Sequence, residues 1–104
     1  MLSQDILNYC IAHSKNETEH LSNLRRENDL KTTRPGMLSG ELQGQFLQML
    51  ASISKVEHCL EIGTFTGYAS LCLAMGIPAS GNLTTIEINE ELSYFHDKYI
   101  LNHE

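Results

Sequence analysis

A glycine-bearing turn between two acidic residues is the part of this sequence best suited to chemistry. The turn, Gly63-Thr64-Phe65-Thr66-Gly67, follows an apolar run that ends in Glu61 and Ile62, and Glu87 ends the next apolar run. Glycine lets a backbone turn tightly and approach a ligand closely, and amides at the start of the following helix can receive an anion. An acid about 20 residues after such a turn commonly binds ribose hydroxyls. The pattern predicts a nucleotide-type cofactor site beyond the carboxyl ends of two strands.

The spacing of the glycines disfavours the dinucleotide fingerprint of nicotinamide-dependent oxidoreductases. That fingerprint requires G-x-G-x-x-G, whereas Phe65 occupies the middle position and the second glycine is Gly67. The form Glu-x-Gly-x-x-x-Gly, carried by Glu61, Gly63 and Gly67, instead resembles the pattern of S-adenosylmethionine-dependent methyltransferases. Phe65 itself is open between core packing and ligand contact.

Several residues around the turn are suited to bind parts of S-adenosylmethionine. Glu61 can meet the ammonium group of the methionine part, Glu87 can accept both ribose hydroxyls, and Ile88 can face the adenine. The hydroxyls of Thr64, Thr66 and Ser70 are further donors for the cofactor carboxylate. The structural alternatives are that the turn only joins a strand to a helix, and that Glu87 caps or salt-links a surface loop.

Three helices followed by a β-α-β-α order are expected to position the turn. Hydrophobic periodicity and turn signals predict helices over 3–13, 16–28 and 40–54, strands over 56–62 and 83–88, and helices over 67–75 and from Asn89 onward. The strands are expected to be parallel, joined by a right-handed crossover. The fold class is therefore α/β. Two parallel strands leave edges without a partner, which favours a truncated chain or a partner that completes the sheet.

Helix caps and apolar faces can also be predicted. Ser3 is a candidate cap of the first helix, Ser14 and Glu17 have the form of a capping box for the second, and Asn89 suits the start of the last. The apolar faces are expected to comprise Leu21 and Leu24; Leu42, Phe46, Met49, Leu50 and Ile53; Tyr68, Leu71, Cys72 and Met75; and Leu92, Phe95, Tyr99 and Ile100.

Composition excludes several other classes of function. The net charge of −6 gives no support for nucleic-acid binding, which relies on a basic footprint. The three cysteines are odd in number and irregularly spaced, which predicts buried free thiols in a reducing compartment. The N-terminus lacks the features of a signal peptide and no stretch suits a membrane span, so a cytoplasmic location without a membrane partner is expected. The five histidines show no metal-ligand spacing.

Three segments in order are similar to the O-methyltransferase family that includes catechol and caffeoyl-CoA O-methyltransferases, especially its small bacterial members. They are residues 37–45, residues 60–68 and residues 85–89, and the likeness is most specific over 32–89. The resemblance implies a Rossmann-like class I methyltransferase that moves a methyl group from S-adenosylmethionine to a hydroxyl of a small molecule. It further implies a divalent cation, commonly Mg²⁺, and often a homodimer.

Carried over by position, the resemblance implies a cofactor-binding set. Its members are Met37, Ser39, Glu61, Gly63, Phe65, Gly67, Ser70, Glu87 and Ile88. One departure is that the family often has Ser directly after the Gly-Tyr pair, where this chain has Ala69 followed by Ser70. The family's metal-binding acids and acceptor-activating residues lie further along the chain, so no catalytic residue and no metal ligand are assigned here.

The length of the chain predicts that it forms only part of a domain. A complete domain of this kind needs about twice as many residues, because each βα unit takes ~30. Residues 1–104 are therefore expected to form the N-terminal part of a single methyltransferase domain, truncated after the second βα unit. Residues 1–54 would be a helical lead-in and residues 55–104 the β-α-β-α cofactor-binding part. This chain alone is expected to be inactive, and the alternative is a cofactor-binding module or remnant without catalysis.

Overall fold

The computed structural model, which describes residues 2–102, has the predicted order of helices and strands. Three helices come first: α1 (Gln4–Ala12), α2 (Glu19–Lys31) and α3 (Gly40–Ile53). The β-α-β unit follows as β1 (His58–Ile62), α4 (Tyr68–Gly76) and β2 (Asn82–Ile86). Two short 3-10 turns are η1 (Pro35–Met37) and η2 (Glu90–Leu92), and the C-terminal helix combines α5 (Ser93–His96) with a π-helical turn, η3 (Asp97–Leu101).

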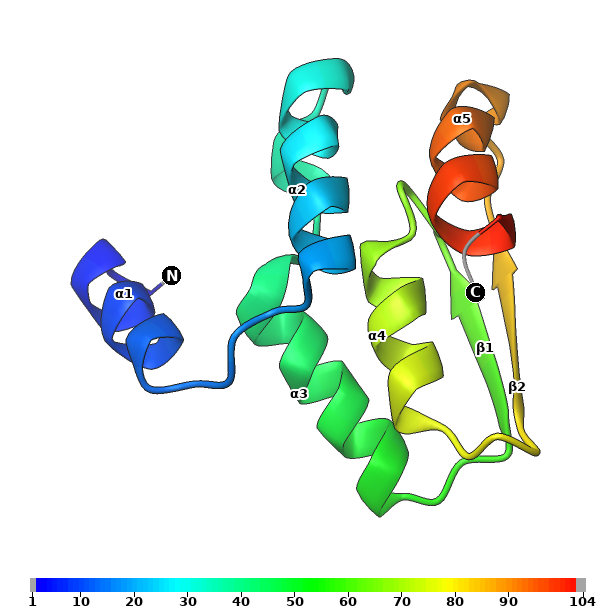
Figure 1. Cartoon of the computed structure of the whole chain (residues 1–104), viewed down its shortest axis with the longest axis horizontal. Helices are drawn as coiled ribbons and strands as arrows, with labels where there is room; N and C mark the ends of the chain where they lie inside the picture. The colour runs from blue at the N-terminus through cyan, green and yellow to red at the C-terminus, as the bar shows by residue number, and fades with distance from the viewer. Residues whose placement is uncertain (1, 103–104) are drawn as a thin grey trace.

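The two strands form a parallel sheet with one covered and one bare face. Their register runs from His58 opposite Asn82 to Ile62 opposite Ile86. Figure 1 shows α4 lying along one side of the sheet, with α3 beyond it. On the opposite face Leu60, Ile62 and Ile86 are 63%, 81% and 53% exposed. Parallel sheets are normally covered on both faces, but the described residues leave this face uncovered.

The hydrophobic core lies between α2, α4 and the C-terminal helix. It contains Leu21 and Leu24 from α2, Tyr68 and Cys72 from α4, and Leu92, Phe95 and Tyr99 from the C-terminal segment. These seven residues were all expected to face inward, so that part of the prediction is confirmed. Leu71 and Ile100 are half-buried, whereas Met75 is exposed and was predicted wrongly.

Helix α3 packs through its small residues instead of its large apolar ones. Gly44 and Ala51 are buried. Of the expected stripe, Leu42 is half-buried, whereas Phe46, Met49, Leu50 and Ile53 are exposed. A Cβ at Gly44 would lie 2.6 Å from Cys72 Sγ, and one at Gly76 would lie 2.3 Å from the Gln48 carbonyl oxygen. Glycines on both helices thus allow a close crossing, which sets the rotation of α3 and turns the large side chains outward.

The start of α2 also differs from its prediction. Thr18, not Ser14, caps the helix, since its Oγ1 accepts a hydrogen bond from the Leu21 N–H at 3.2 Å. Ser14 instead donates to the Cys10 carbonyl at 2.5 Å, at the end of α1. The expected capping box is therefore wrong, and Glu17 is free to bind elsewhere. The caps at Ser3 and Asn89 are confirmed.

The cysteines are free, but they are not all buried. Cys72 is buried in the core, while Cys10 and Cys59 are only half-buried. The expectation of three buried thiols was thus too broad, because α1 contributes no buried residue and Cys59 lies on a short strand.

Candidate functional site

The carboxyl ends of the two strands bring the glycine turn and Glu87 together. The backbone N–H groups of Gly63 and Thr64 donate to the Ile86 carbonyl at 2.8 and 3.2 Å. The side-chain hydroxyls of Thr64 and Thr85 lie 2.6 Å apart. Parallel pairing therefore places residues more than twenty positions apart in sequence at one sheet edge, as the sequence predicted.

Glu87 is held by backbone amides. Its Oε1 accepts from the Phe65 N–H at 2.7 Å, and its Oε2 accepts from the Ile88 and Asn89 N–H groups at 3.1 and 3.0 Å. These hydrogen bonds, led by that from Asn89, lower the pKa of the Glu87 carboxyl. The group is thus an oriented carboxylate at neutral pH. Because a carboxylate offers about four acceptor positions, binding two ribose hydroxyls requires one amide to yield.

The two glycines of the turn have different surroundings. Gly63 has φ +97°, and a Cβ built there would meet nothing within 4 Å, so open space lies above it. Gly67 has φ +101°, but its Cβ would lie 2.7 Å from Ile100 Cδ1. The N–H of Gly67 donates to the Thr64 carbonyl at 2.9 Å. Gly63 therefore leaves room for a ligand, whereas Gly67 leaves room for the C-terminal helix.

Glu61 and Ser70 bind each other on the covered face of the sheet. Glu61 Oε1 accepts hydrogen bonds from the Ser70 hydroxyl and from Thr85 Oγ1, the latter at 2.6 Å. Ser70 is buried and Glu61 is half-buried. In this structure the Ser70 hydroxyl is therefore engaged with Glu61, beneath the turn.

A small hollow beside the turn collects four of the nine predicted residues. It has a volume of about 40 Å³ and is lined by Met37, Ser39, Gly63 and Phe65, together with Tyr68 and other neighbours. Glu87 adjoins it through its bond to the Phe65 N–H. Ile88, the residue expected to face adenine, is 95% exposed. The 3-10 turn before α3 thus lies against the glycine turn.

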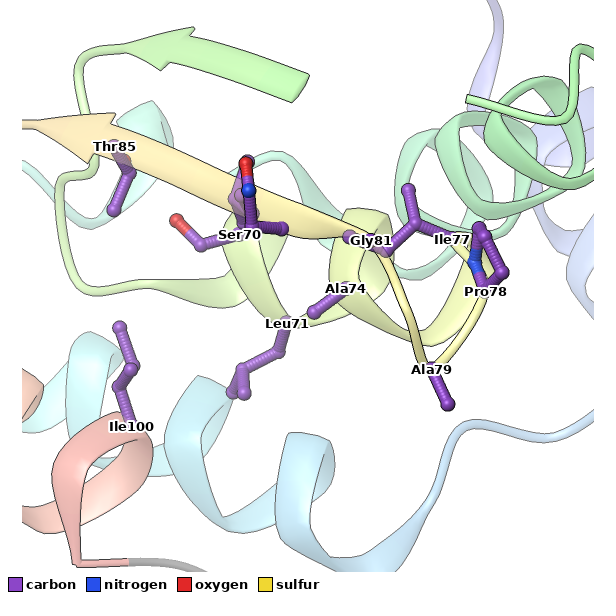
Figure 2. Close-up of a pocket in the computed structure, with 11 residues that line it drawn as sticks. Ser70, Leu71, Ala74, Ile77, Pro78, Ala79, Gly81, Thr85 and Ile100 are labelled. Atoms are coloured by element: carbon purple, nitrogen blue, oxygen red, sulfur yellow. The ribbon is translucent and has the colours of Figure 1, made fainter. Parts of the chain in front are cut away.

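A larger cavity lies elsewhere. It measures about 400 Å³ and is bounded by α4, the loop after it, β2 and Ile100. Figure 2 shows Ser70 and Thr85 on one side of this cavity, with Leu71 and Ile100 nearby. Ser70 is its only member from the predicted set. The cavity is therefore separate from the hollow at the glycine turn.

A partly buried polar cluster ties the N-terminal segment to the start of α4. Tyr68 donates to Glu17 Oε2 at 2.5 Å, and Arg25 donates to Glu17 Oε1. Burial opposes ionisation of Glu17, but the bonds from Arg25 and Tyr68 outweigh it and lower the pKa of this carboxyl. Burial and the adjacent Glu17 raise the pKa of Tyr68. Sequence reasoning missed this contact because 51 residues separate the partners.

Two further findings concern metal-binding groups and membrane-spanning helices. Within residues 2–102, no group of three or more His, Cys, Asp or Glu side chains could hold a metal ion. In the same described range, none of the helices is both long enough and apolar enough to cross a membrane.

Comparisons with known proteins agree with the fold. The O-methyltransferase family matches residues 11–103. Caffeoyl-CoA O-methyltransferase 2 of Petunia hybrida is 45% identical over 49 residues, which cover 47% of this chain and 20% of that protein. Catechol O-methyltransferase domain-containing protein 1 of Mus musculus is 35% identical over 83 residues, covering 80% of this chain and 31% of that one.

Solved structures extend the agreement to three dimensions. An O-methyltransferase from Bacillus cereus in complex with SAH has a TM-score of 0.84 and 27% identity, covering 93% of this chain and 44% of that one. The O-methyltransferase TomG from Streptomyces achromogenes, in complex with SAM, has a TM-score of 0.78 and 31% identity, covering 97% and 47%. The predicted α/β, Rossmann-like fold class is thereby confirmed. The chain spans less than half the length of these relatives.

The family match covers most of the chain, and it includes the 3-10 turn, the glycine turn and Glu87 that meet at the strand ends. The chain belongs to the O-methyltransferase family.

Proposed function

We propose that this chain supplies the S-adenosylmethionine-binding part of an O-methyltransferase that acts on a hydroxyl of a small molecule. One observation carries the proposal: the open space above Gly63 lies next to a carboxylate, Glu87, which three backbone amides orient. The solved relatives bound to SAH or SAM support the choice of cofactor. The named caffeoyl-CoA and catechol relatives support a hydroxyl acceptor.

The residues at the strand ends fit the parts of this cofactor. Glu87 accepts from the ribose, Ile88 covers the adenine, and Gly63 lets the methionine part approach the backbone. Thr66 is fully buried, and its Oγ1 has no hydrogen-bond partner within the described chain. This orphaned hydroxyl lies in the turn itself and is a candidate donor to a bound ligand. When bound, S-adenosylmethionine supplies the methyl group that is transferred.

The remaining predicted residues act around this centre. Met37 and Ser39 close the hollow from the turn before α3. Phe65 lines the hollow and donates its N–H to Glu87. Glu61, Gly67 and Ser70 support the turn from below, through the Glu61–Ser70 hydrogen bond and the packing of Ile100 on Gly67. We assign these last three residues an indirect role in cofactor binding.

Two further properties of the whole protein are proposed, its association with more protein and its location. The bare sheet face and the exposed apolar side of α3 suit burial against more protein, including a second subunit. Three free cysteines suit a reducing, cytoplasmic location. No step is assigned to a divalent cation, since no described group of side chains fits one.

The test is calorimetric titration of the purified chain with S-adenosylmethionine. We expect saturable binding that Glu87→Ala weakens about 10- to 100-fold, since hydrogen bonds to a charged group contribute about 1.5–3 kcal/mol. Glu27→Ala is the matched control, because Glu27 lies in a separate cluster formed with Lys98 and Tyr94. Equal affinity of Glu87→Ala and wild type would refute the assignment of this site.

A methyl-transfer assay on a panel of catechols then separates the two readings of the chain. Cation-dependent turnover supports a competent enzyme. Cofactor binding without turnover supports the alternative of a binding module that lacks catalysis on its own.

A further inference from the structure

Phe65 adopts a backbone conformation that is unfavourable for its side chain. Its φ is +51°, in the left-handed region, where a non-glycine residue costs about 1–2 kcal/mol. Lys55 is the other non-glycine residue with positive φ in the described part of the chain. Strain of this kind persists only where the surroundings impose it, and it is frequent at ligand sites. The strained backbone of Phe65 therefore indicates that neighbouring groups hold this residue in place.

Two side chains from the second βα unit hold Phe65, one on each side of its Cα. Its N–H donates to Glu87 Oε1 at 2.7 Å, and its carbonyl oxygen lies 2.6 Å from Nε2 of His96. A carbonyl can only accept, so Nε2 of His96 carries the proton of this hydrogen bond. The Phe65 ring meanwhile lines the hollow at the turn and packs against the core.

His96 is presented from a well-anchored helix. Its neighbours Phe95 and Tyr99 are buried in the core, and Ile100, one turn further on, contacts Gly67 of the same loop. His96 itself is half-buried. The C-terminal helix thus contacts the glycine turn twice, by a hydrogen bond at Phe65 and by packing at Gly67. A donor on a fixed helix can set the orientation of a loop peptide.

We propose that His96 is a positioning residue for the cofactor site: its bond to the Phe65 carbonyl fixes the left-handed peptide that aims the Phe65 N–H at Glu87. This inference rests on the proposed function. Without the bond, Phe65 relaxes toward a negative φ, its N–H leaves Glu87, and the carboxylate loses one of its three amide partners. The shape of the hollow and the orientation of the ribose-binding acid then change together. His96 acts through Phe65 and is not assigned a contact with the cofactor.

The experiment compares substitutions that keep or remove the donor. His96→Phe keeps a ring and removes the donor, whereas His96→Gln keeps an N–H donor on a shorter side chain. His13→Gln is the matched control, because His13 is exposed and bonds only within its own helical segment, to the Tyr9 carbonyl. Two quantities are measured on the full chain: hydrogen exchange of the Phe65 amide by NMR, and affinity for S-adenosylmethionine by calorimetry.

We expect His96→Phe to speed exchange of the Phe65 amide and to weaken binding about 5- to 10-fold, the worth of one neutral hydrogen bond. His96→Gln should stay within about threefold of wild type, and His13→Gln should match it. Unchanged exchange in His96→Phe would overturn the proposal, as would a Gln variant as impaired as the Phe variant.

A second background, Phe65→Gly, distinguishes the loss of this positioning from a general loss of folding. In Phe65→Gly the left-handed conformation costs little, so adding His96→Phe should have a smaller effect than in wild type. An equal effect in both backgrounds would overturn the proposal. If the folded wild-type chain fails to bind S-adenosylmethionine, the proposed function fails. In that case the exchange of the Phe65 amide still decides whether His96 positions the turn.

Discussion

Two regions of the molecule are organised around an acid, and they are built differently. At the glycine turn, Glu87 is held by backbone N–H groups of Phe65, Ile88 and Asn89. On the surface between α2 and the C-terminal helix, Glu27 is held by side chains: Lys98, Lys31 and the Tyr94 hydroxyl. Both acids have a lowered pKa.

The difference lies in what each arrangement fixes. Backbone amides belong to a turn with left-handed residues, so they fix the direction of the Glu87 carboxylate. Lysine side chains are long and rotatable, so the Glu27 cluster fastens one helix to another without defining a precise geometry. An oriented acid beside open space suits a binding site, whereas a multiply paired surface acid suits a structural tie.

The largest effect is expected from filling the glycine turn. In Gly67→Ala a side chain is forced into the left-handed region and against Ile100, which should lower the free energy of unfolding by about 2–4 kcal/mol. Gly63→Ala, its matched control, carries the strain without the overlap and should cost about 1–2 kcal/mol. Urea unfolding measures both.

Adding Ile100→Val to Gly67→Ala removes the terminal methyl group that lies closest to the new Cβ. The double variant should therefore lose less stability than the sum of the two single variants. If the stability losses of the two single variants simply add in the double variant, Ile100 is not what excludes a side chain at position 67.

A smaller effect is expected from acidification. Burial tends to raise the pKa of Glu27, but hydrogen bonds from Lys98 and Tyr94 prevail and lower it to about 2. Because the folded-state pKa lies below the unfolded value, this acid stabilises the fold at neutral pH. That contribution is lost as the pH falls from about 4.5 toward 2.

The measurement is unfolding of wild type and Glu27→Gln from about pH 6, which is above this window, to about pH 2, which is its lower end. The stability difference between them should be less than about 1 kcal/mol at neutral pH and should shrink on acidification. A difference that grows as the pH falls would contradict the assigned direction.

The smallest effect is expected from salt. Raising the ionic strength to about 1 M shortens the screening length to about 3 Å and should weaken the coupling of Glu27 to Lys98. A double-mutant cycle with Glu27→Gln and Lys98→Met measures that coupling at low and high salt. Exchange of the Phe65 amide, which reports on Glu87, should be unaffected. Equal salt sensitivity of both regions would remove the distinction between them.

Local patterns predicted the helices and strands well. They failed where tertiary contacts decided between two capping residues or between two sides of a helix. The helix and strand order, the caps at Ser3 and Asn89, and the core residues Leu24 and Phe95 followed from periodicity and side-chain chemistry. The capping box at Ser14 failed because Thr18 offered an equivalent oxygen and Glu17 found Tyr68 and Arg25. The apolar stripe of α3 failed because glycine contacts set its rotation.

The candidate site shows the same division. Spacing alone placed Gly63 and Glu87 at neighbouring strand ends, because parallel strands joined by a helix present their carboxyl ends at one edge. Spacing could not separate the open space at Gly63 from the packed environment of Gly67, nor reveal His96 behind Phe65. Those features depend on where the C-terminal helix docks.

By itself, then, the sequence determined the α/β order and the two ends of the site, because these follow from short-range periodicity and from one repeated strand-turn geometry. Its motifs indicated the family by resemblance. Only the tertiary structure decided which glycine adjoins open space, which acid is oriented by amides and which side of α3 is buried. Such choices depend on contacts between residues tens of positions apart, and no local pattern encodes those distances.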